Sequence, residues 1–141
     1  MKLYFILCTL KQCDSNILTR GDVVKVLIGG CRHYNDYASF CDQVKRIISE
    51  VCINDSIIIF SGHCSGVDML GERYAEENGY RVELFPAEWD KYGRAAGPVR
   101  NRQMVEKAEL VIAFWDGRSK GTRSLIGYAE KLHKTLRIVE I

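Results

Sequence analysis

Residues 57–68, IIIFSGHCSGVD, form the stretch that decides how the rest of the chain folds. Its four opening residues are apolar and three of them are β-branched, which predicts a buried strand. Gly62 and Gly66 follow, and the amphipathic run after them predicts a helix that begins near Asp68. A tight turn between a strand and a helix points backbone N–H groups and a helix N-terminus at one position, where both favour an anion such as a phosphate. This stretch therefore predicts a site for a nucleotide-like ligand, without deciding whether the protein acts chemically on it.

The composition is that of an ordinary globular protein with a single domain. The chain has 141 residues, of which 47% are hydrophobic and 27% charged, so it can bury a real core. Its net charge of +2 is too small to indicate nucleic-acid binding from charge alone. The six cysteines fit neither a Cys-x-x-Cys zinc pattern nor a small disulfide framework, and His33 and His63 lack a spaced set of partners. We therefore expect no metal site and a reducing, cytoplasmic location.

The first 22 residues are predicted to form an extension to a domain that covers residues 23–141. Residues 3–10 are apolar between Lys2 and Lys11, and this run is too short to span a bilayer. We interpret it as an extra edge strand, followed by a loop or linker at 13–22, and we expect no membrane partner. An apolar edge strand is a liability when it is left unpaired, so the extension also predicts a homo-oligomer such as a dimer.

The remainder of the chain alternates between strands and helices. Further strands are predicted at residues 23–28, 80–85, 110–115 and 136–141. Helices are predicted at 37–51, from Asp68 to 78, from Pro98 to 108 and at about 122–133, while 87–97 is predicted to be a long loop. This alternation predicts an α/β, three-layer, Rossmann-like fold. Its sheet is expected to be mostly parallel and doubly wound, with about five strands plus the N-terminal edge strand.

The loops that contain glycine or arginine all lie at the carboxyl ends of the predicted strands. They are residues 29–36, 61–68, 86–102 and 116–122. In doubly wound sheets, ligands bind outside this edge, near the point where the strand order reverses. This convergence is the strongest indication of a site that the residues themselves provide.

The charged side chains in these loops each allow two interpretations. A guanidinium fork suits phosphate oxygens, but an arginine such as Arg100 or Arg102 can also be an ordinary solvated loop charge. Asp68 either contacts a ligand or only favours the first turn of its helix, and Asp116 either accepts hydrogen bonds from ribose hydroxyls or only shapes its turn. Residues 121–122 either bind phosphate through their N–H groups or only cap a helix.

The aromatic residues and a histidine–cysteine pair also allow more than one interpretation. Trp89 and Trp115 can stack on a base, or they can pack in the core or in a lid. His63 beside Cys64 suggests a nucleophile with its base, but no third group that orients the pair is identifiable. Neither G-x-x-x-x-G-K-[ST] nor G-x-G-x-x-G occurs, which argues against a P-loop NTPase and an ordinary dehydrogenase.

Five blocks of sequence occur in an order that resembles a known family. They are VLIGGCR at 26–32, SGHCSGVD at 61–68, PAEW at 86–89, GRAAGPVRNRQM at 93–104 and AFWDGRSKGT at 113–122. From about residue 25 to residue 141, the chain is similar to the small stand-alone YspA-related proteins of the SLOG superfamily. The resemblance implies a Rossmann-like fold and a pocket for a nucleotide or a nucleotide-derived, ADP-ribose-like ligand, with no certain cofactor.

The turns in these blocks are expected to cradle a phosphate, with Arg100 as its clamp. The candidate ligand-binding residues are Gly30, Cys31, Arg32, Gly62, Ser65, Gly66, Asp68, Arg100, Asn101, Arg102, Asp116, Gly117, Ser119, Gly121 and Thr122. Trp89 and Trp115 are the candidates for base stacking, and Arg100 and Asp116 are the candidates for a catalytic role.

Two better understood groups share parts of this pattern and imply other functions. Residues 61–68 and 100–102 resemble signature runs of the DNA-processing protein A family, which binds single-stranded DNA, although the modest net charge argues against that function. The Lonely Guy group of phosphoribohydrolases, which cut the N-glycosidic bond of nucleoside monophosphates, pairs an Arg-Lys with a later Gly-Thr and Glu. This chain has Asn101 at the lysine position and Leu125 at the glutamate position. The carboxylate that would handle the proton or stabilise an oxocarbenium ion is therefore missing from that position.

These observations lead to one main hypothesis and two alternatives. The main hypothesis is a binding protein for a nucleotide or nucleotide derivative, with a role in sensing or signalling. The alternatives are hydrolysis of a nucleotide's N-glycosidic bond and binding of single-stranded DNA.

Overall fold

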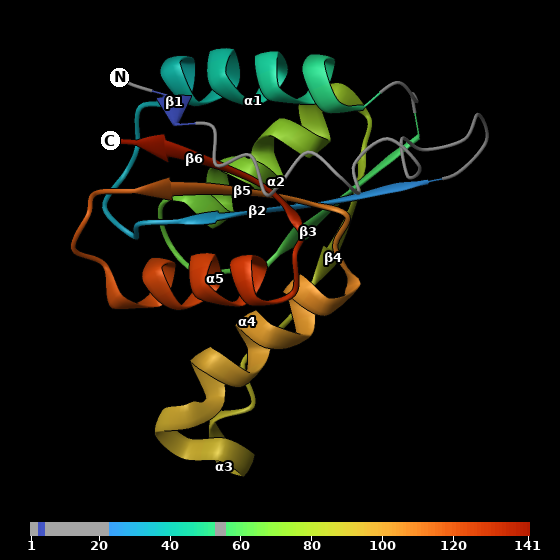
Figure 1. The fold of residues 1–141 in the computed structure, drawn as a ribbon. Coiled ribbons are helices and arrows are strands. Elements are labelled where there is room, and N and C mark those ends of the chain that lie inside the picture. The colour runs from blue at the N-terminus through green and yellow to red at the C-terminus, as the bar shows by residue number, and fades with distance from the viewer. Residues whose placement is uncertain (1–2, 5–22, 53–55) are drawn as a thin grey trace.

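The computed structural model describes residues 3–4, 23–52 and 56–141, and it shows a sheet covered by helices on both faces (Figure 1). The described strands are β1 (Leu3–Tyr4), β2 (Val24–Gly30), β3 (Ile57–Ser61), β4 (Arg81–Leu84), β5 (Leu110–Trp115) and β6 (Thr135–Glu140). Their order across the sheet is β1-β6-β5-β2-β3-β4. Strands β2 to β6 run parallel to one another, and β1 pairs antiparallel with β6. The predicted α/β, Rossmann-like fold is confirmed.

The N-terminal expectation is tested only in part. The edge strand expected at residues 3–10 is present as β1 at Leu3–Tyr4. Residues 5–10 and the loop expected at 13–22 lie outside the described residues. Among the residues that are described, no helix combines the length and the apolar character needed to cross a membrane.

The helices form the two outer layers. They are α1 (Tyr37–Val51), α2 (Val67–Asn78), α3 (Trp89–Tyr92), α4 (Ala96–Lys107) and α5 (Lys120–Lys131), with a 3₁₀ turn at Gly93–Ala95. Figure 1 shows α1 and α2 above the sheet, and α4 and α5 below it. The apolar faces of α1, α2, α4 and α5 pack on the sheet, whereas α3 contacts α4 and buries no residue of its own. The strands in the middle are therefore buried on both sides, as their continuous apolar sequences require.

Two of the helices begin and end where their residues provide caps. The side chain of Asp36 accepts a hydrogen bond from the Ser39 N–H at 3.0 Å and thereby starts α1. Gly79 ends α2 with a left-handed φ of +71°, and its N–H reaches the carbonyls of Ala75 and Glu76. Both ends agree with the sequence-based boundaries.

Two segments differ from the expectation. Residues 87–97, expected to be a loop, contain the short helix α3, the 3₁₀ turn and the start of α4 at Ala96. Elements this short span too few residues to show a hydrophobic period, which explains why the pattern gave no signal. Helix α5 begins at Lys120 rather than near Thr122, because Ser119 is its N-cap and accepts the Thr122 N–H at 3.4 Å.

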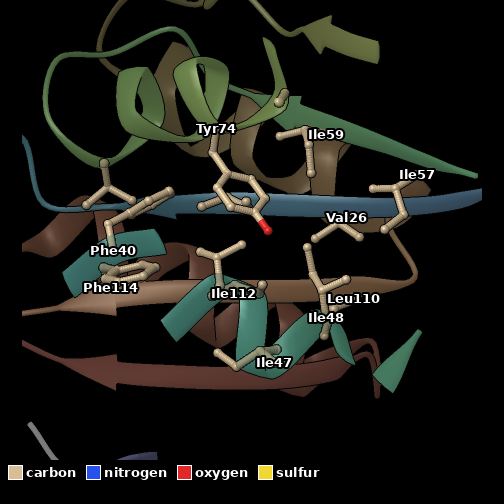
Figure 2. Close-up of a cluster of buried hydrophobic side chains, with 14 of the residues drawn as sticks. Val26, Phe40, Ile47, Ile48, Ile57, Ile59, Tyr74, Leu110, Ile112 and Phe114 are labelled. Atoms are coloured by element: carbon tan, nitrogen blue, oxygen red, sulfur yellow. The ribbon is translucent and has the colours of Figure 1, made fainter. Parts of the chain in front are cut away.

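The core between the sheet and the helices α1 and α2 is built around stacked aromatic rings (Figure 2). The rings of Phe40 and Phe114 lie 4.9 Å apart, and Tyr74 meets Phe40 edge-on at 6.2 Å. Ile59 and Ile112 from neighbouring parts of the sheet fill the space beside them. Phe114 is fully buried in this core, one residue before the end of β5. Its packing therefore fixes the point at which the loop after β5 leaves the sheet.

The strand order creates a gap at one place. From β2 the chain winds outward to β3 and β4, and it then crosses back to β5 on the other side of β2. The loops that leave β2 and β5 therefore diverge to opposite faces of the sheet, which opens a crevice between them at the carboxyl edge.

Candidate functional site

A cavity of about 440 Å³ lies in this crevice at the carboxyl ends of the strands. Its lining residues are Gly29, Gly30, Cys31, Arg32, His33, Cys64, Asp68, Arg100, Asn101, Met104, Asp116, Arg118, Ser119, Gly121, Thr122 and Leu125. A second, more open hollow of about 450 Å³ shares Cys31, His33 and Asp116 with it and extends towards Tyr34 and Ile141. The structure thus brings together loops that are far apart in the sequence.

The turns after β2 and β3 meet with their backbones in contact. The N–H of Val67 donates to the carbonyl of Cys31 at 3.2 Å, and Cys31 itself donates to the Phe114 carbonyl at 3.1 Å. Gly66 has a φ of +78°, and a Cβ there would lie 2.4 Å from the Cys31 oxygen. A Cβ on Gly30 would lie 2.4 Å from the Phe114 oxygen. These glycines are required by the protein's own packing.

The turn after β3 uses several of its N–H groups inside the protein. The His63 N–H donates to the Ser61 hydroxyl at 3.0 Å, and the Cys64 N–H donates to Asp68 Oδ2 at 3.2 Å. Val67 uses its N–H on the β2 turn, as described above. Gly62, Ser65 and Gly66, which were expected to contact the ligand, are not among the residues that line the cavity. Within this turn Cys64 lines the cavity, and these three residues lie behind it.

Arg100 is a buried link between three segments. Its side chain donates through Nη1 to the carbonyls of Gly62 at 2.7 Å and Phe85 at 3.4 Å, and through Nε to Asn101 at 3.2 Å. Its Nη2 lies 3.7 Å from the Cys64 sulfur. Only 8% of Arg100 is exposed, although it borders the cavity. The guanidinium therefore connects α4 to the turns after β3 and β4, so Arg100 stabilises the fold in addition to any contact with a ligand.

Asp68 brings a buried carboxylate to the same wall. It is 7% exposed, and burial raises its pKa from 3.8 to about 6, against the opposing effects of the Cys64 N–H and of Arg100. No ion pair joins it to a described residue, because Arg100 is used by the carbonyls. Asp68 therefore accepts a hydrogen bond within the turn after β3, in addition to its favourable position in the first turn of α2.

The loop after β5 forms the opposite wall. Oδ1 of Asp116 accepts the N–H groups of Arg118 and Ser119, both at 2.8 Å, and these bonds hold the pKa of this exposed carboxyl below its ordinary value. Asp116 thus shapes its turn, and its contact with a ligand stays a prediction. The hydroxyl of Ser119 accepts from the Thr122 hydroxyl at 3.0 Å, and burial raises the pKa of the neighbouring Cys31 thiol. This wall is a fixed turn that leads into α5.

Two arginines at the mouth of the cavity are free to act on a ligand. Arg32 follows β2 and Arg118 follows β5, and both are exposed and line the cavity. Neither guanidinium makes a hydrogen bond or an ion pair with any residue in the described part of the chain. Two cations that face a cavity without a protein partner favour an anionic ligand.

Ten of the predicted site residues line the cavity, and the remaining ones lie elsewhere. The ten are Gly30, Cys31, Arg32, Asp68, Arg100, Asn101, Asp116, Ser119, Gly121 and Thr122. Arg102 instead pairs with Glu106 on the surface of α4 at 2.9 Å. Trp89 is 55% exposed on α3, and Trp115 donates from Nε1 to the Ser119 carbonyl at 3.2 Å. Neither tryptophan lines the cavity, and neither does Gly117.

Several lining residues are absent from the candidate ligand-binding set, although they follow from helical spacing or from neighbouring loop positions. They are Gly29, His33, Cys64, Met104, Arg118 and Leu125. Met104 lies one helical turn after Arg100, and Leu125 lies three residues after Thr122, so both face the cavity with the residue that was recognised. Arg118 and Cys64 belong to loops that had already been singled out.

A third group for His63 exists, and it also was missed. Oε1 of Glu72 accepts from the Ser61 hydroxyl at 2.7 Å and lies 2.9 Å from Nδ1 of His63. His63 has a φ of +57°, and its side chain is largely exposed. The sulfur of Cys64 instead approaches the Gly62 carbonyl at 3.8 Å and Arg100, and no bond between Cys64 and His63 is present. The histidine and the cysteine therefore do not form a catalytic pair in this arrangement.

Metal ligands do not gather anywhere in the described ranges: no group of three or more His, Cys, Asp or Glu side chains there could hold an ion. The carboxylates of the cavity are Asp68 and Asp116, one on each wall. The cavity thus combines two guanidinium groups at its mouth with a largely buried carboxylate in its wall.

Comparison with known proteins places the chain in a family. Residues 24–92 match the YspA, cpYpsA-related SLOG family. The Gene 61 protein of Mycobacterium phage D29 is 32% identical over 113 residues, which cover 76% of this chain and 89% of the phage protein. The chain belongs to the YspA, cpYpsA-related SLOG family. The SLOG resemblance inferred from the sequence blocks is confirmed.

A solved structure supports the fold. The DNA processing protein A of Streptococcus pneumoniae superposes with a TM-score of 0.60 at 17% sequence identity. The match covers 81% of this chain and 49% of that protein, so the chain spans about half the length of the solved structure. At this identity the likeness shows a common fold.

Proposed function

We propose that this SLOG protein binds a phosphate-containing ligand of the nucleotide class in the cavity at the switch point, and that binding serves sensing or signalling. The observation that carries the proposal is the pair of free guanidinium groups, Arg32 and Arg118, at the mouth of one cavity. They approach the cavity from the loops after β2 and β5, so an anion between them would join both sides of the crevice.

The N-terminus of α5 supports the same ligand class. Ser119 and Thr122 satisfy one another, but the N–H groups of Lys120 and Gly121 make no hydrogen bond to a described residue. The positive end of the helix dipole and free N–H groups favour a phosphate. The volume of about 440 Å³, extended by the adjoining hollow, is in the range of sites for small ligands and cofactors.

The test is a thermal-unfolding screen of the full chain with a panel of ligands. The panel contains nucleoside mono-, di- and triphosphates, NAD, ADP-ribose, ribose 5-phosphate and inorganic phosphate. A ligand at about a thousand times its dissociation constant adds roughly 4 kcal/mol to the free energy of unfolding. We expect the shift to be lost in Arg118→Ala and in Arg32→Ala.

Arg102→Ala is the matched control, because this arginine is also exposed but pairs with Glu106 away from the cavity. Its thermal shift is expected to equal that of the wild type. No shift with any phosphate-containing compound, or equal losses in all three variants, would contradict the proposal. Arg100→Ala is a poor test of binding, because removing this buried link also weakens the fold.

Hydrolysis of a nucleotide's glycosidic bond is the second candidate, and the largely buried carboxylate of Asp68 is the observation that favours it. Leu125 lines the cavity at the position where the phosphoribohydrolase pattern has glutamate, so α5 supplies no carboxylate there. Asp68, whose pKa is raised by burial to about 6, is a general-acid candidate on the opposite wall. Release of free base from a nucleoside monophosphate, lost in Asp68→Asn, would support this function. Absence of release across a broad panel would exclude it.

DNA is a third ligand class, suggested by the name of the solved structure with the same fold, and the sequence resemblance implies its single-stranded form. Binding through phosphates alone would weaken steeply with salt. An oligonucleotide titration at several salt concentrations separates this function from nucleotide binding. A flat response, or no binding, would exclude it.

Self-association and a cytoplasmic, reducing location are further parts of the proposal. Strand β4 is an exposed edge of the sheet, and β1 meets only β6 among the described strands. The described cysteines, Cys31, Cys41, Cys52 and Cys64, are free thiols. Light scattering of the full chain and of a variant that lacks residues 1–22 tests whether the N-terminal segment makes the contact.

A further inference from the structure

The carboxylate of Asp68 is an acceptor whose hydrogen-bonding capacity is only half used. Oδ2 accepts the Cys64 N–H at 3.2 Å, whereas Oδ1 has no partner among the described residues. Oδ1 lies on the side of Gly29, because a Cβ on that glycine would be 3.7 Å away from it. Gly29 itself lines the cavity. The free oxygen therefore lies at the cavity, on a side chain that is 93% buried in the wall.

The charged groups around Asp68 do not satisfy this oxygen. Arg100 from α4 uses its Nη1 and Nε on the carbonyls of Gly62 and Phe85 and on Asn101. Glu72 from α2 raises the pKa of Asp68, and Arg32 from the β2 turn lowers it only from a distance. Oδ1 is not fully buried, so it is accessible from the cavity, and a donor on a ligand there can bond to it.

The chemistry of the donor follows from the rest of the cavity. Arg32, Arg118 and the start of α5 favour negative charge, so a cationic amine is unsuitable as the main binding group. A phosphate cannot face Asp68 either, because two anions in contact repel each other. The group that faces Asp68 is therefore a neutral donor on a ligand whose phosphate lies at the arginines.

We propose that Asp68 accepts a hydrogen bond from a sugar hydroxyl, so that the cavity selects phosphorylated sugars and ribonucleotides with free hydroxyls over bare anions and over analogues without hydroxyls. The inference rests on the proposed function, since it needs a phosphate-bearing ligand in this cavity. It assigns Asp68 as a specificity-determining residue and the two free arginines as the source of anion affinity. The ionised carboxylate is the acceptor, so discrimination is strongest above pH 6.

The test compares two phosphates that differ only in hydroxyl groups. Ribose 5-phosphate and tetrahydrofurfuryl phosphate, the same ring with the hydroxyls removed, are titrated by calorimetry into the full chain at pH 7.5. A hydrogen bond to a buried charged acceptor predicts about 10- to 100-fold tighter binding of the hydroxyl-bearing compound. In Asp68→Ala the two affinities are expected to become equal, and in Asp68→Asn the ratio is expected to fall to a few-fold.

The outcomes separate this inference from the proposed function. Equal affinities of the two compounds for the wild type overturn the hydroxyl-acceptor role of Asp68 but leave phosphate binding intact. No binding of either compound, or of inorganic phosphate and nucleotides, overturns both. Because the comparison of ligands on the wild type decides the matter, a variant that fails to fold does not obstruct the test. Asp68→Asn keeps the oxygen that accepts from Cys64 and is expected to fold.

Discussion

The two walls of the cavity use glycine for opposite reasons. The inner wall comprises Gly29 and Gly30 at the cavity and Gly62 and Gly66 behind them, and a Cβ on any of these would meet another part of the protein at 2.4 to 2.8 Å. On the outer wall, residues 116–122, a Cβ on Gly117 or Gly121 would meet nothing within 4 Å. The glycines of the inner wall are therefore explained by packing, and the outer wall is where space is left for a ligand.

Apart from Oδ1 of Asp68, the inner wall uses its polar groups within the protein. The turn after β3 donates N–H groups to Ser61, Asp68 and Cys31. Arg100 donates to two backbone carbonyls beside this turn, those of Gly62 and Phe85. The outer wall keeps two N–H groups of α5 and the side chain of Arg118 free. A glycine-rich motif can thus be prominent in the sequence because of how it packs, while a neighbouring loop supplies the groups that bind.

The largest expected effect comes from placing a Cβ on the inner wall. Gly66→Ala combines a φ of +78° with a contact at 2.4 Å to the Cys31 carbonyl, which cannot move without disturbing β2. We expect a loss of about 4 kcal/mol in the free energy of unfolding. Urea denaturation measures it.

Gly117→Ala is the matched control, because its φ is +79° and its surroundings are open. This variant keeps the backbone strain and lacks the contact, so we expect a loss of about 1 kcal/mol. If both variants lose the same amount, backbone strain alone determines the cost, and the distinction between the walls fails.

The second prediction concerns two arginines that lie two residues apart on α4. Arg100→Ala leaves the carbonyls of Gly62 and Phe85 without a donor in a buried place, so we expect a loss of about 3 kcal/mol. Arg102→Ala removes an exposed pair with Glu106 and is expected to change stability by less than about 0.5 kcal/mol. Urea unfolding of both variants checks the difference, and similar losses would show that Arg100 is not a link of the inner wall.

Arg100 and Arg102 show how much of the site could be predicted from the sequence. The alternation of strands and helices predicted the sheet, and the rule for ligand sites in such sheets predicted the edge at which the cavity lies. The 3.6-residue period also separates positions 100 and 102 onto different faces of a helix, so that distinction was available from spacing. The presence of a glycine-rich block in the sequence, by contrast, does not say whether an N–H group faces a ligand or the protein itself.

Other contacts of the site could be recognised only in the three-dimensional structure. Glu72 meets His63 because α2 folds back over the turn after β3, and no short pattern links these positions. Trp115 ends a buried strand, but its ring turns towards Ser119 and away from the cavity. Helix α3 is too short to leave a hydrophobic period. These are consequences of packing between segments that are distant in sequence.

The third prediction is the pH dependence of the inner wall. The pKa of Asp68 is raised from 3.8 to about 6, so the folded state binds the proton more tightly than the unfolded state does. The stabilising contribution of the protonated carboxyl is therefore present below about pH 4 and is lost as the pH rises through about 6. At pH 7.5 the buried charge costs about 3 kcal/mol, part of which already applies below pH 4.

Asp68→Asn removes this charge and keeps the shape of the side chain. Its free energy of unfolding, relative to the wild type, is expected to rise by about 2 kcal/mol between pH 4 and pH 7.5. Urea unfolding of both proteins across this range measures the difference. A difference that stays constant with pH would show that Asp68 titrates alike in both states, and that its burial carries no electrostatic penalty.

The smallest effect is expected on the outer wall, at Gly121. This residue is the second of α5, and a Cβ there meets nothing within 4 Å, so Gly121→Ala adds helix propensity without a clash. We expect a gain of about 0.5–1 kcal/mol in the free energy of unfolding, measured by urea denaturation. The same methyl group narrows a wall that lines the cavity, so phosphate-dependent thermal shifts are expected to shrink while the protein becomes more stable. A loss of stability would mean that Gly121 is fixed by packing like the inner-wall glycines, and an unchanged ligand shift would place the bound phosphate away from the start of α5.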